Sequence, residues 1–455
     1  MYQNSNTGRG TDQAPSAALP EDADKITSRK IYVLALLMLI SAFNYFDRSL
    51  LGLLAPMIRA DIHITDIEYG LISGFAFVLF YALMGVPIAA YSDRTSARKV
   101  ISIGFTVWSF MTLLTGAVTN AWQLAATRFL MGAGEACAVA PSNAMITSMF
   151  GARWRTRALA IFVASSSISS IVFFPLGGLL GARYGWRMVF VIAGLAGLAV
   201  AVLFALTVKD PPRPARADQA GEAQGTLFDF SFVRGPFLLI LCSSAMAGAH
   251  LYAGLAWTAI FLDRVHGLGV AEISVVLGPY RGVLSAFGVL MAGYLTDRLS
   301  RRNVKWRIWL PALTCLILFP AQVMFLAGES RWVWMLGLGL EAVFMLGHAA
   351  PIYSVAMLIA GPRRRAVAVS LMLLSSSLVG TSLGPLLVGY LNDRVFASIG
   401  PDAIRYSMLV IAVFPAGSAL MLTLAGRLLD PEILRIDNRK TQEASFGEGT
   451  PRTAH

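Results

Sequence analysis

The stretch Asp93–Arg98 reads DRTSAR, and it recurs as DRLSRR at Asp297–Arg302, 204 residues further along the chain. A second basic stretch repeats more loosely: Gly151–Arg157 reads GARWRTR, and Gly361–Arg365 reads GPRRR, 210 residues later. Each of the four stretches directly follows a long apolar segment. Two repeats with nearly the same offset indicate a duplicated unit, so we expect two structurally similar halves.

The composition indicates a membrane protein. Of 455 residues, 56% are hydrophobic and 14% are charged, against about 25% charged in soluble proteins, and the mean hydropathy is +0.64. Backbone groups in lipid find no outside hydrogen-bond partner, so long apolar runs predict helices. We expect an all-α membrane protein with twelve transmembrane helices in two pseudo-symmetric six-helix halves. The segments lie near 31–56, 69–91, 100–119, 122–149, 158–181, 186–207, 236–262, 270–296, 308–327, 332–360, 366–391 and 406–426.

The positive charge reports membrane topology. The formal net charge is +11, and 27 of the 37 Lys and Arg residues lie on the side that holds both chain ends, with 7 on the other side and 3 within spans. Basic loops are retained in the cytoplasm. We therefore expect a multi-pass protein of the cytoplasmic (inner) membrane with both termini cytoplasmic, and nucleic acid is not needed to explain the charge.

These spans divide the chain into five parts. We expect disordered cytoplasmic tails at 1–28 and 431–455, six-helix halves at 29–209 and 235–430, and a cytoplasmic linker at 210–234. The first 28 residues lack the basic-then-apolar pattern of a signal peptide, so the first span is expected to direct insertion.

Motifs for a metal, a cofactor or an enzyme are missing from the sequence. Cys137, Cys242 and Cys315 fall within spans, and no Cys/His cluster has metal-ligand spacing. A Gly-x-x-x-x-Gly-Lys-Ser/Thr loop does not occur, which argues against ATP as the energy source. We expect no cofactor, no metal and no enzymatic activity.

The first span carries charges at a depth where lipid would penalise them. Asn44–Arg48 reads NYFDR within an apolar run. An Asp or Arg facing lipid there costs roughly 2.5–3.5 kcal/mol, so Asp47 and Arg48 are expected to face a polar interior, as a shielded structural pair or as a functional site. Glu135 in the fourth span and Arg128, two helical turns earlier, lie on one helix face. If the two spans are adjacent, the four charges cancel, and a proton on either acid would leave an arginine unpaired.

The second half carries fewer charges within its spans. Arg281 lies near the centre of the eighth span with no acid within one turn, so it contacts either an anionic substrate or Glu341 in the tenth span. His250 and His348 could titrate near neutral pH or be ordinary core residues. Anchoring at the membrane interface is expected to explain most of the aromatic residues such as Trp108, Trp257, Trp306 and Trp332.

The loops after the second and eighth spans resemble the signature loop of the major facilitator superfamily, and the resemblance covers nearly the whole chain outside the tails. An Asp at a helix end and nearby Arg residues can latch neighbouring helices in one conformation and release them in the other. Two positions depart from the family pattern, Ala89 in place of Gly and Ala97 in place of Arg or Gly, which predicts a weaker latch in the first half. The gating residues expected from this resemblance are Asp93, Arg94, Arg98, Asp297, Arg298 and Arg302.

Two branches of this family are similar in sequence. They are the spinster-like transporters and the organic anion:cation symporters. Both carry an Asn-Tyr-x-Asp-Arg stretch in the first span and a Glu-Ala pair in the fourth span, as this chain does, so these motifs do not separate the two branches. Spinster-like resemblance implies proton-linked movement of lysophospholipid- or sphingolipid-like amphiphiles, with Asp47 as the protonation switch. The stretches that resemble spinster-like transporters include Asn44–Arg48, Gly132–Ala136, Gly185–Arg187 and Phe261–Leu268.

We expect a proton-coupled secondary transporter that works as a monomer among membrane lipids and moves an anionic or amphiphilic organic solute by alternating access. Protons are expected at Asp47 and Glu135. Two alternatives stay open: proton symport of a small organic acid into the cell, and a transporter-like receptor that senses its ligand without moving it. The expected substrate-binding residues are Arg48, Arg128, Arg281, Tyr45, Glu341 and His250.

Overall fold

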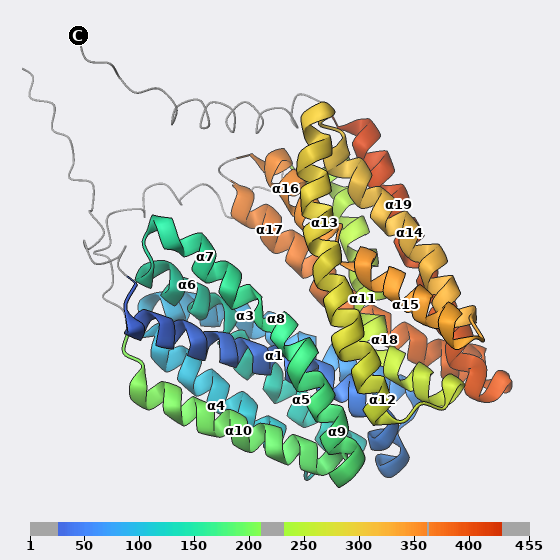
Figure 1. Cartoon of the computed structure of the whole chain (residues 1–455), viewed down its shortest axis with the longest axis horizontal. Helices are drawn as coiled ribbons and strands as arrows, with labels where there is room; N and C mark the ends of the chain where they lie inside the picture. The colour runs from blue at the N-terminus through green and yellow to red at the C-terminus, as the bar shows by residue number, and fades with distance from the viewer. Residues whose placement is uncertain (1–25, 211–231, 362–363, 430–455) are drawn as a thin grey trace, which may run out of the picture.

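The chain folds into two helical bundles that lie side by side (Figure 1). The computed structural model describes residues 26–210, 232–361 and 364–429, and every regular element within these ranges is helical. The predicted all-α fold with two six-helix halves is confirmed. Residues 1–25 of the predicted N-terminal tail, the predicted C-terminal tail and most of the predicted linker lie outside the described residues, and Ser28 already belongs to the first helix.

In the first half, several spans are built from more than one helical element, and π-helical turns are labelled η. The six spans are α1 (Ser28–Ile62); α2 (Asp66–Gly70), η2 (Leu71–Phe75) and α3 (Ala76–Arg94); α4 (Ala97–Thr115); α5 (Ala121–Ala136) and α6 (Val139–Met149); α7 (Ala152–Val163), α8 (Ser165–Ile168), η3 (Ser169–Phe173) and α9 (Phe174–Tyr184); and α10 (Trp186–Thr207).

The second half follows the same plan. Ten helical segments in the described ranges are long and apolar enough to cross a membrane, and the helices of the second and fourth spans complete the twelve. The six spans of this half are α11 (Pro236–His266); α12 (Val270–Val275), η5 (Val276–Tyr280) and α13 (Arg281–Arg302); α14 (Trp306–Ala327); α15 (Arg331–Met345) and α16 (Ala349–Ala360); α17 (Arg365–Leu374), η7 (Ser375–Val379), α18 (Gly380–Tyr390) and η8 (Leu391–Val395); and the short 3-10 helix η9 (Ala397–Asp402) with α19 (Ala403–Leu428).

Mid-span π-helical turns occur in two matching pairs. The turns η2 and η5 begin 205 residues apart, and η3 and η7 begin 206 residues apart. These offsets match those of the repeated loops. Since π-helical turns are rare and mark irregular points in helices, the duplication extends from the loops into the helix interiors.

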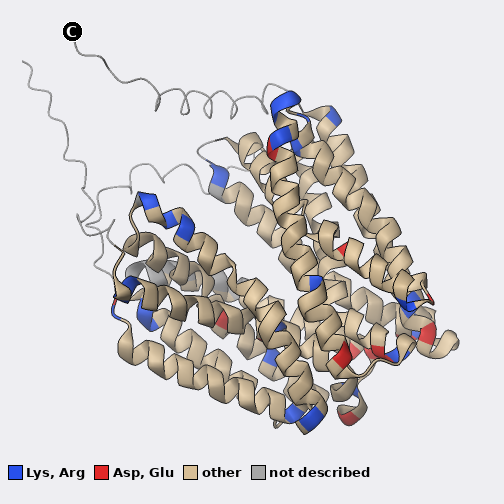
Figure 2. Ribbon diagram, in the orientation of Figure 1, with Lys and Arg blue, Asp and Glu red and all other residues tan. Residues whose placement is uncertain are grey.

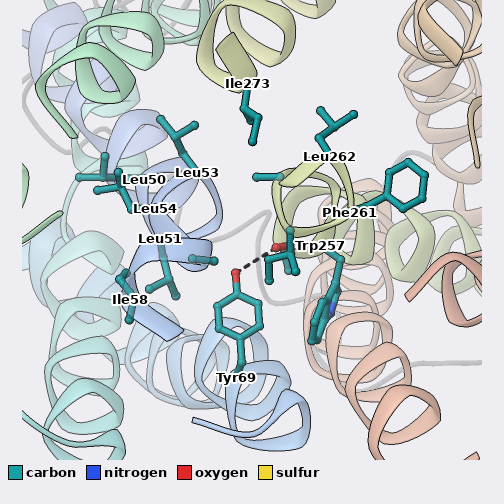
Figure 3. Close-up of a cluster of buried hydrophobic side chains, with 14 of the residues drawn as sticks. Leu50, Leu51, Leu53, Leu54, Ile58, Tyr69, Trp257, Phe261, Leu262 and Ile273 are labelled. Atoms are coloured by element: carbon teal, nitrogen blue, oxygen red, sulfur yellow. Dashed lines mark hydrogen bonds between the residues drawn. The ribbon is translucent and has the colours of Figure 1, made fainter. Parts of the chain in front are cut away.

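The two halves meet at one end of the molecule and diverge toward the other (Figure 1). At this closed end α1 packs on α11, α9 on α12, and α2 on α18. A buried apolar cluster joins the halves, with Leu51 and Tyr69 from the first and Trp257 and Phe261 from the second (Figure 3). The Tyr69 hydroxyl donates to the carbonyl oxygen of Ala256 at 2.9 Å, and the Tyr69 ring lies edge-on to Trp257 with centroids 5.0 Å apart. The closed end is therefore sealed largely by apolar packing.

Close approach of the two halves depends on glycine. A Cβ at Gly52 of α1 would overlap the carbonyl oxygen of Leu255 on α11, and one at Gly74 would overlap the carbonyl oxygen of Thr381 on α18. A larger side chain at either position would separate the backbones.

Charged residues lie mostly toward the two ends of the bundles and are sparse between them (Figure 2). One group of charges, the interface clamp, crosses the closed end. It is centred on Asp66, the first residue of α2, which is 4% exposed. Arg264 of α11 donates to both Asp66 carboxylate oxygens at 2.9 Å, and Asn392 Nδ2 of η8 donates to Oδ2 at 2.8 Å. Arg59 of α1 forms an ion pair with the same carboxylate. One carboxylate of the first half thus binds two side chains of the second.

The clamp stays ionised over a wide pH range. Burial acts to raise the pKa of Asp66, but the hydrogen bonds and charge of Arg264, together with Arg59 and Asn392, outweigh it and lower the pKa below its ordinary value of 3.8. A carboxylate with a lowered pKa contributes its full stabilisation above the ordinary value and loses it as the pH falls through the lowered one. The clamp therefore holds the closed end at any pH near neutrality.

Replacing Asp66 with Asn should open the closed end. The substitution removes both ion pairs and leaves two partly buried arginines. We therefore expect the equilibrium between this arrangement and one in which the halves are apart at this end to shift toward the latter by roughly tenfold or more. Spin labels at Tyr184 and Ile399, both exposed at this end, would report the change as a longer inter-label distance in pulsed electron resonance.

The matched control is Asp61→Asn. Asp61 is 46% exposed and pairs with Arg187 of the same half at 2.9 Å, so its loss should leave the inter-label distance unchanged. In the unsubstituted protein the distance should also stay constant from about pH 8 to about pH 5. An Asp66→Asn protein with the original distance distribution would show that apolar packing alone closes this end.

Candidate functional site

Arg48 and Glu135 form an ion pair within the first half. Arg48 Nε of α1 donates to Glu135 Oε2 of α5 at 2.7 Å; the Glu135 side chain is fully buried, whereas 30% of the Arg48 side chain is exposed. The rings of Phe77 and Tyr81 lie 4.9 and 5.1 Å from the Arg48 guanidinium carbon. Tyr45, one turn earlier on α1, is 43% exposed. Arg48 is thus a neutralised cation that remains accessible from one side.

Asp47 is bound by neutral donors. Its carboxylate is 2% exposed, and Oδ2 accepts hydrogen bonds from Trp108 Nε1 and, at 3.1 Å, from Thr112 Oγ1, both on α4. Its other oxygen, Oδ1, has no hydrogen-bond partner among the described residues. A buried carboxylate without a bound cation is a natural proton acceptor, because burial penalises its charged form.

Arg128 completes the predicted group of four charges but binds neither carboxylate. Its Nη1 donates to the backbone oxygen of Asp47 at 3.4 Å, and its guanidinium carbon lies 5.6 Å from the centre of the Phe190 ring. Arg128 is buried, and its Nε and Nη2 have no hydrogen-bond partner in the described part of the chain. The structure therefore brings all four residues together. Glu135 forms an ion pair with Arg48, whereas Asp47 accepts hydrogen bonds from neutral side chains.

A second buried ion pair lies in the other half. Arg281 Nη2, at the start of α13, lies 2.8 Å from Glu341 Oε1 of α15 and 3.0 Å from the Met345 sulfur. His250 Nε2 of α11 lies 4.0 Å from the same Glu341 oxygen, and neither ring nitrogen of His250 has a hydrogen-bond partner within the described ranges. Of the two partners that the sequence allowed for Arg281, Glu341 is the one bound in this state.

Glu341 occupies the position in the second half that Glu135 occupies in the first. The two residues are 206 apart and lie on the corresponding helices α15 and α5. Each binds an arginine of its own half, but Arg48 comes from the first span and Arg281 from the eighth. The glutamates therefore occupy corresponding positions in the two halves, whereas the arginines that bind them do not.

The predicted latch residues whose side chains the structure describes show contacts within their own half. Arg98 donates through its backbone N–H to Asp210 Oδ1 at 3.0 Å and through its guanidinium to the carbonyl oxygen of Ala205, both near the end of α10. In the second half Arg298 donates to the Tyr294 hydroxyl at 2.7 Å. Asp297 and Arg302 are exposed at the open end, and the side chains of Asp93 and Arg94 lie outside what the structure describes. The contacts of Arg98 and Arg298 therefore do not connect the two halves.

Two tryptophans are placed differently from the prediction. Trp108 and Trp257 are fully buried, and they donate to Asp47 and to the carbonyl oxygen of Pro385. These two tryptophans are exceptions to the expected anchoring at the membrane interface, because each is buried and its indole N–H donates to an acceptor on another helix. The interface clamp was not predicted, because charges at span ends are common and no local pattern connects Asp66 with Arg264.

Comparison with known proteins places this geometry in a family. Residues 37–385 match the model of the Major Facilitator Superfamily. An MFS-type efflux pump of Mycolicibacterium smegmatis is 32% identical over 405 residues, which cover 88% of this chain and 93% of the pump. A probable galactarate/D-glucarate transporter, GudP of Bacillus subtilis, is 25% identical over 341 residues, covering 68% of this chain and 74% of that protein.

A solved structure gives the same fold. The crystal structure of a bacterial homolog to the human lysosomal transporter spinster, in an inward-facing and unoccupied conformation, has a TM-score of 0.79 and 28% identity, covering 88% of this chain and 98% of that one. The resemblances to spinster-like and organic-anion transporters are both confirmed. The chain therefore belongs to the Major Facilitator Superfamily and is a multi-pass membrane transporter of organic solutes rather than an enzyme.

Proposed function

We propose that this chain is a proton-coupled secondary transporter that moves an anionic, amphiphilic organic solute across the cytoplasmic membrane by alternating access. The observation that carries the proposal is the Asp47 carboxylate. It is buried, it is held by neutral donors, and it directly precedes Arg48, the accessible member of an ion pair. A proton site and an anion-binding cation thus lie next to each other on α1.

Charge balance couples the two ligands. With all groups ionised, Asp47, Glu135, Arg48 and Arg128 sum to zero. A proton on Asp47 leaves the group with one positive charge, which favours binding of an anion, and by linkage the bound anion favours the proton. An anion that binds Arg48 also competes with Glu135 for that guanidinium, which would release the second acid to take up a proton.

The second half provides a matching contact for the substrate. The Arg281–Glu341 pair, like Arg48–Glu135, joins a buried glutamate to an arginine of the same half, so an anionic group can compete with Glu341 for Arg281. His250 and Tyr45 would then border the bound solute, each from the first helix of its own half. A solute held between one arginine of each half is a physical link between the halves.

The conformation supports a direction for the molecule in the membrane. The closed end carries the interface clamp, and the opposite end carries the repeated basic loops, where most Lys and Arg residues are found. We assign the open end to the cytoplasm together with both termini, as the positive-inside rule predicts. The single chain contains both halves and works as a monomer.

Two substrate classes are supported by different observations. Likeness to the spinster homolog over most of the chain favours an amphiphile of the lysolipid kind. Likeness to a galactarate/D-glucarate transporter, with arginines in both halves, supports a small organic acid as the second candidate. A thermal-shift screen of the purified protein against lysophospholipids and sugar acids separates them, because the class that binds should raise the melting temperature, and the rise should grow with ligand concentration.

Replacing Asp47 with Asn should abolish proton-driven transport. The amide keeps the shape of the carboxyl group but cannot take up a proton. Accumulation of substrate driven by an imposed pH gradient should therefore fall to background, while exchange of substrate across the membrane persists. Uptake into proteoliposomes, with the ligand from the screen, measures both. Asp61→Asn serves as the control and should accumulate substrate normally. Full gradient-driven uptake by the Asp47→Asn protein would exclude Asp47 as the proton site.

Replacing Arg281 with Ala should weaken anionic ligands selectively. A lost charge-assisted contact corresponds to roughly a tenfold or greater loss of affinity. A lysophospholipid with an anionic headgroup should therefore lose far more affinity than one with the same chain and a zwitterionic headgroup. Arg331→Ala, at an exposed ion pair with Glu272, is the control and should change neither affinity. Equal losses for the two lipids would assign Arg281 to the structure of the second half.

A further inference from the structure

We propose that Trp108 and Thr112 are positioning residues for Asp47, and that their hydrogen bonds set the pH at which this carboxylate takes up its proton. The inference rests on the proposed proton coupling and adds two residues that no motif in the sequence singles out. Both lie one turn apart on α4, the helix that faces Asp47.

The two carboxylate oxygens have different surroundings. Oδ2 accepts from both Trp108 and Thr112, whereas Oδ1 has no partner among the described residues. An indole N–H is a donor only and cannot accept a proton in return. While the indole is bound, Oδ2 must act as an acceptor, so the proton is directed to Oδ1.

Trp108 is held in one place by its packing. It is fully buried, and its ring centroid lies 4.7 Å from that of Phe105. A Cβ at Gly134 of α5 would lie 2.6 Å from the Trp108 Cβ, so α4 and α5 approach as closely as glycine allows. The indole N–H is therefore a fixed donor, which stabilises the ionised form of Asp47 and opposes the effect of burial.

Thr112 differs, because its single hydroxyl hydrogen has two acceptors within reach. Oγ1 lies 3.1 Å from Asp47 Oδ2 and 3.2 Å from the backbone oxygen of Trp108. When Asp47 is ionised the hydroxyl donates to the carboxylate, and when Asp47 is protonated it can turn to the helix carbonyl without leaving a buried donor unpaired. Thr112 thus adapts to the protonation state while Trp108 does not.

The charges around Asp47 are the same in every variant of the test. Arg128 and Glu135 face it from α5, and Arg48, its neighbour on α1, is bound to Glu135. From α4 the described contacts are those of Trp108 and Thr112, which carry no charge. Removing either donor changes the hydrogen bonding of Asp47 and leaves its electrostatic surroundings in place.

Infrared difference spectroscopy of the purified, reconstituted protein measures the protonation of Asp47 without a known substrate. The carboxyl C=O band lost in Asp47→Asn identifies this residue, and its intensity against pH gives a midpoint. Trp108→Phe keeps the ring but removes the N–H, so the midpoint should rise by about one pH unit or more. Thr112→Val should raise it by less, about half a unit, because the Thr112 hydroxyl hydrogen is shared between Asp47 and the Trp108 carbonyl oxygen.

Trp257→Phe is the matched control. Trp257 is equally buried and also loses a hydrogen bond, 3.0 Å long, to the Pro385 carbonyl oxygen, but it does not contact Asp47. Its Asp47 midpoint should equal that of the unsubstituted protein. If Trp108→Phe does not fold, the Thr112→Val midpoint decides.

Unchanged midpoints in Trp108→Phe and Thr112→Val, or an equal rise in Trp257→Phe, would overturn the inference. A result with raised midpoints but no effect of a pH gradient on transport would support the positioning role and contradict proton coupling. The two proposals can therefore fail separately.

Discussion

The ion pair between Arg48 and Glu135 is the interaction on which the first half depends. A charge inside an apolar bundle costs several kcal/mol unless it is paired, and breaking such a pair is strongly destabilising. The pair fixes the rotation of α1 against α5. Because successive residues on a helix point about 100° apart, the same rotation turns Asp47 away from Glu135 and toward α4, where neutral donors bind it. One contact thus gives two neighbouring charges different surroundings.

Polar interactions lie at three levels of the molecule. At the closed end Asp66 has a lowered pKa and stays ionised, so the interface clamp responds to the position of the halves and not to protons. At the open end the latch residues that can be followed bind only within their own half. Between the ends lies Asp47, a buried carboxylate without a bound cation. The residues that close one end of the molecule are therefore separate from the buried Asp47 carboxylate.

The duplication preserves backbone features more closely than side-chain chemistry. Paired π-helical turns recur at offsets of 205 and 206, and Glu135 and Glu341 occupy corresponding helices. The cations that bind these acids come from non-corresponding spans, and the second half has His250 near its acid where the first has Asp47 and Arg128. A repeated scaffold with different charges in each half suits a transporter whose halves bind different parts of one solute.

Sequence patterns alone predict the helical class, the number of spans, the duplication and the charges within the spans, but not the buried Asp66 at a span end. Each follows from a local or periodic property: apolar length for the spans, repeated loops for the halves, and helix periodicity for Arg128 and Glu135. Which of these groups bind one another depends on tertiary packing. Arg48 rather than Arg128 binds Glu135, Trp108 binds Asp47, and Asp66 meets Arg264 across 198 residues of chain. These pairings depend on how each helix is rotated and packed against its neighbours, and a hydropathy pattern does not specify that rotation.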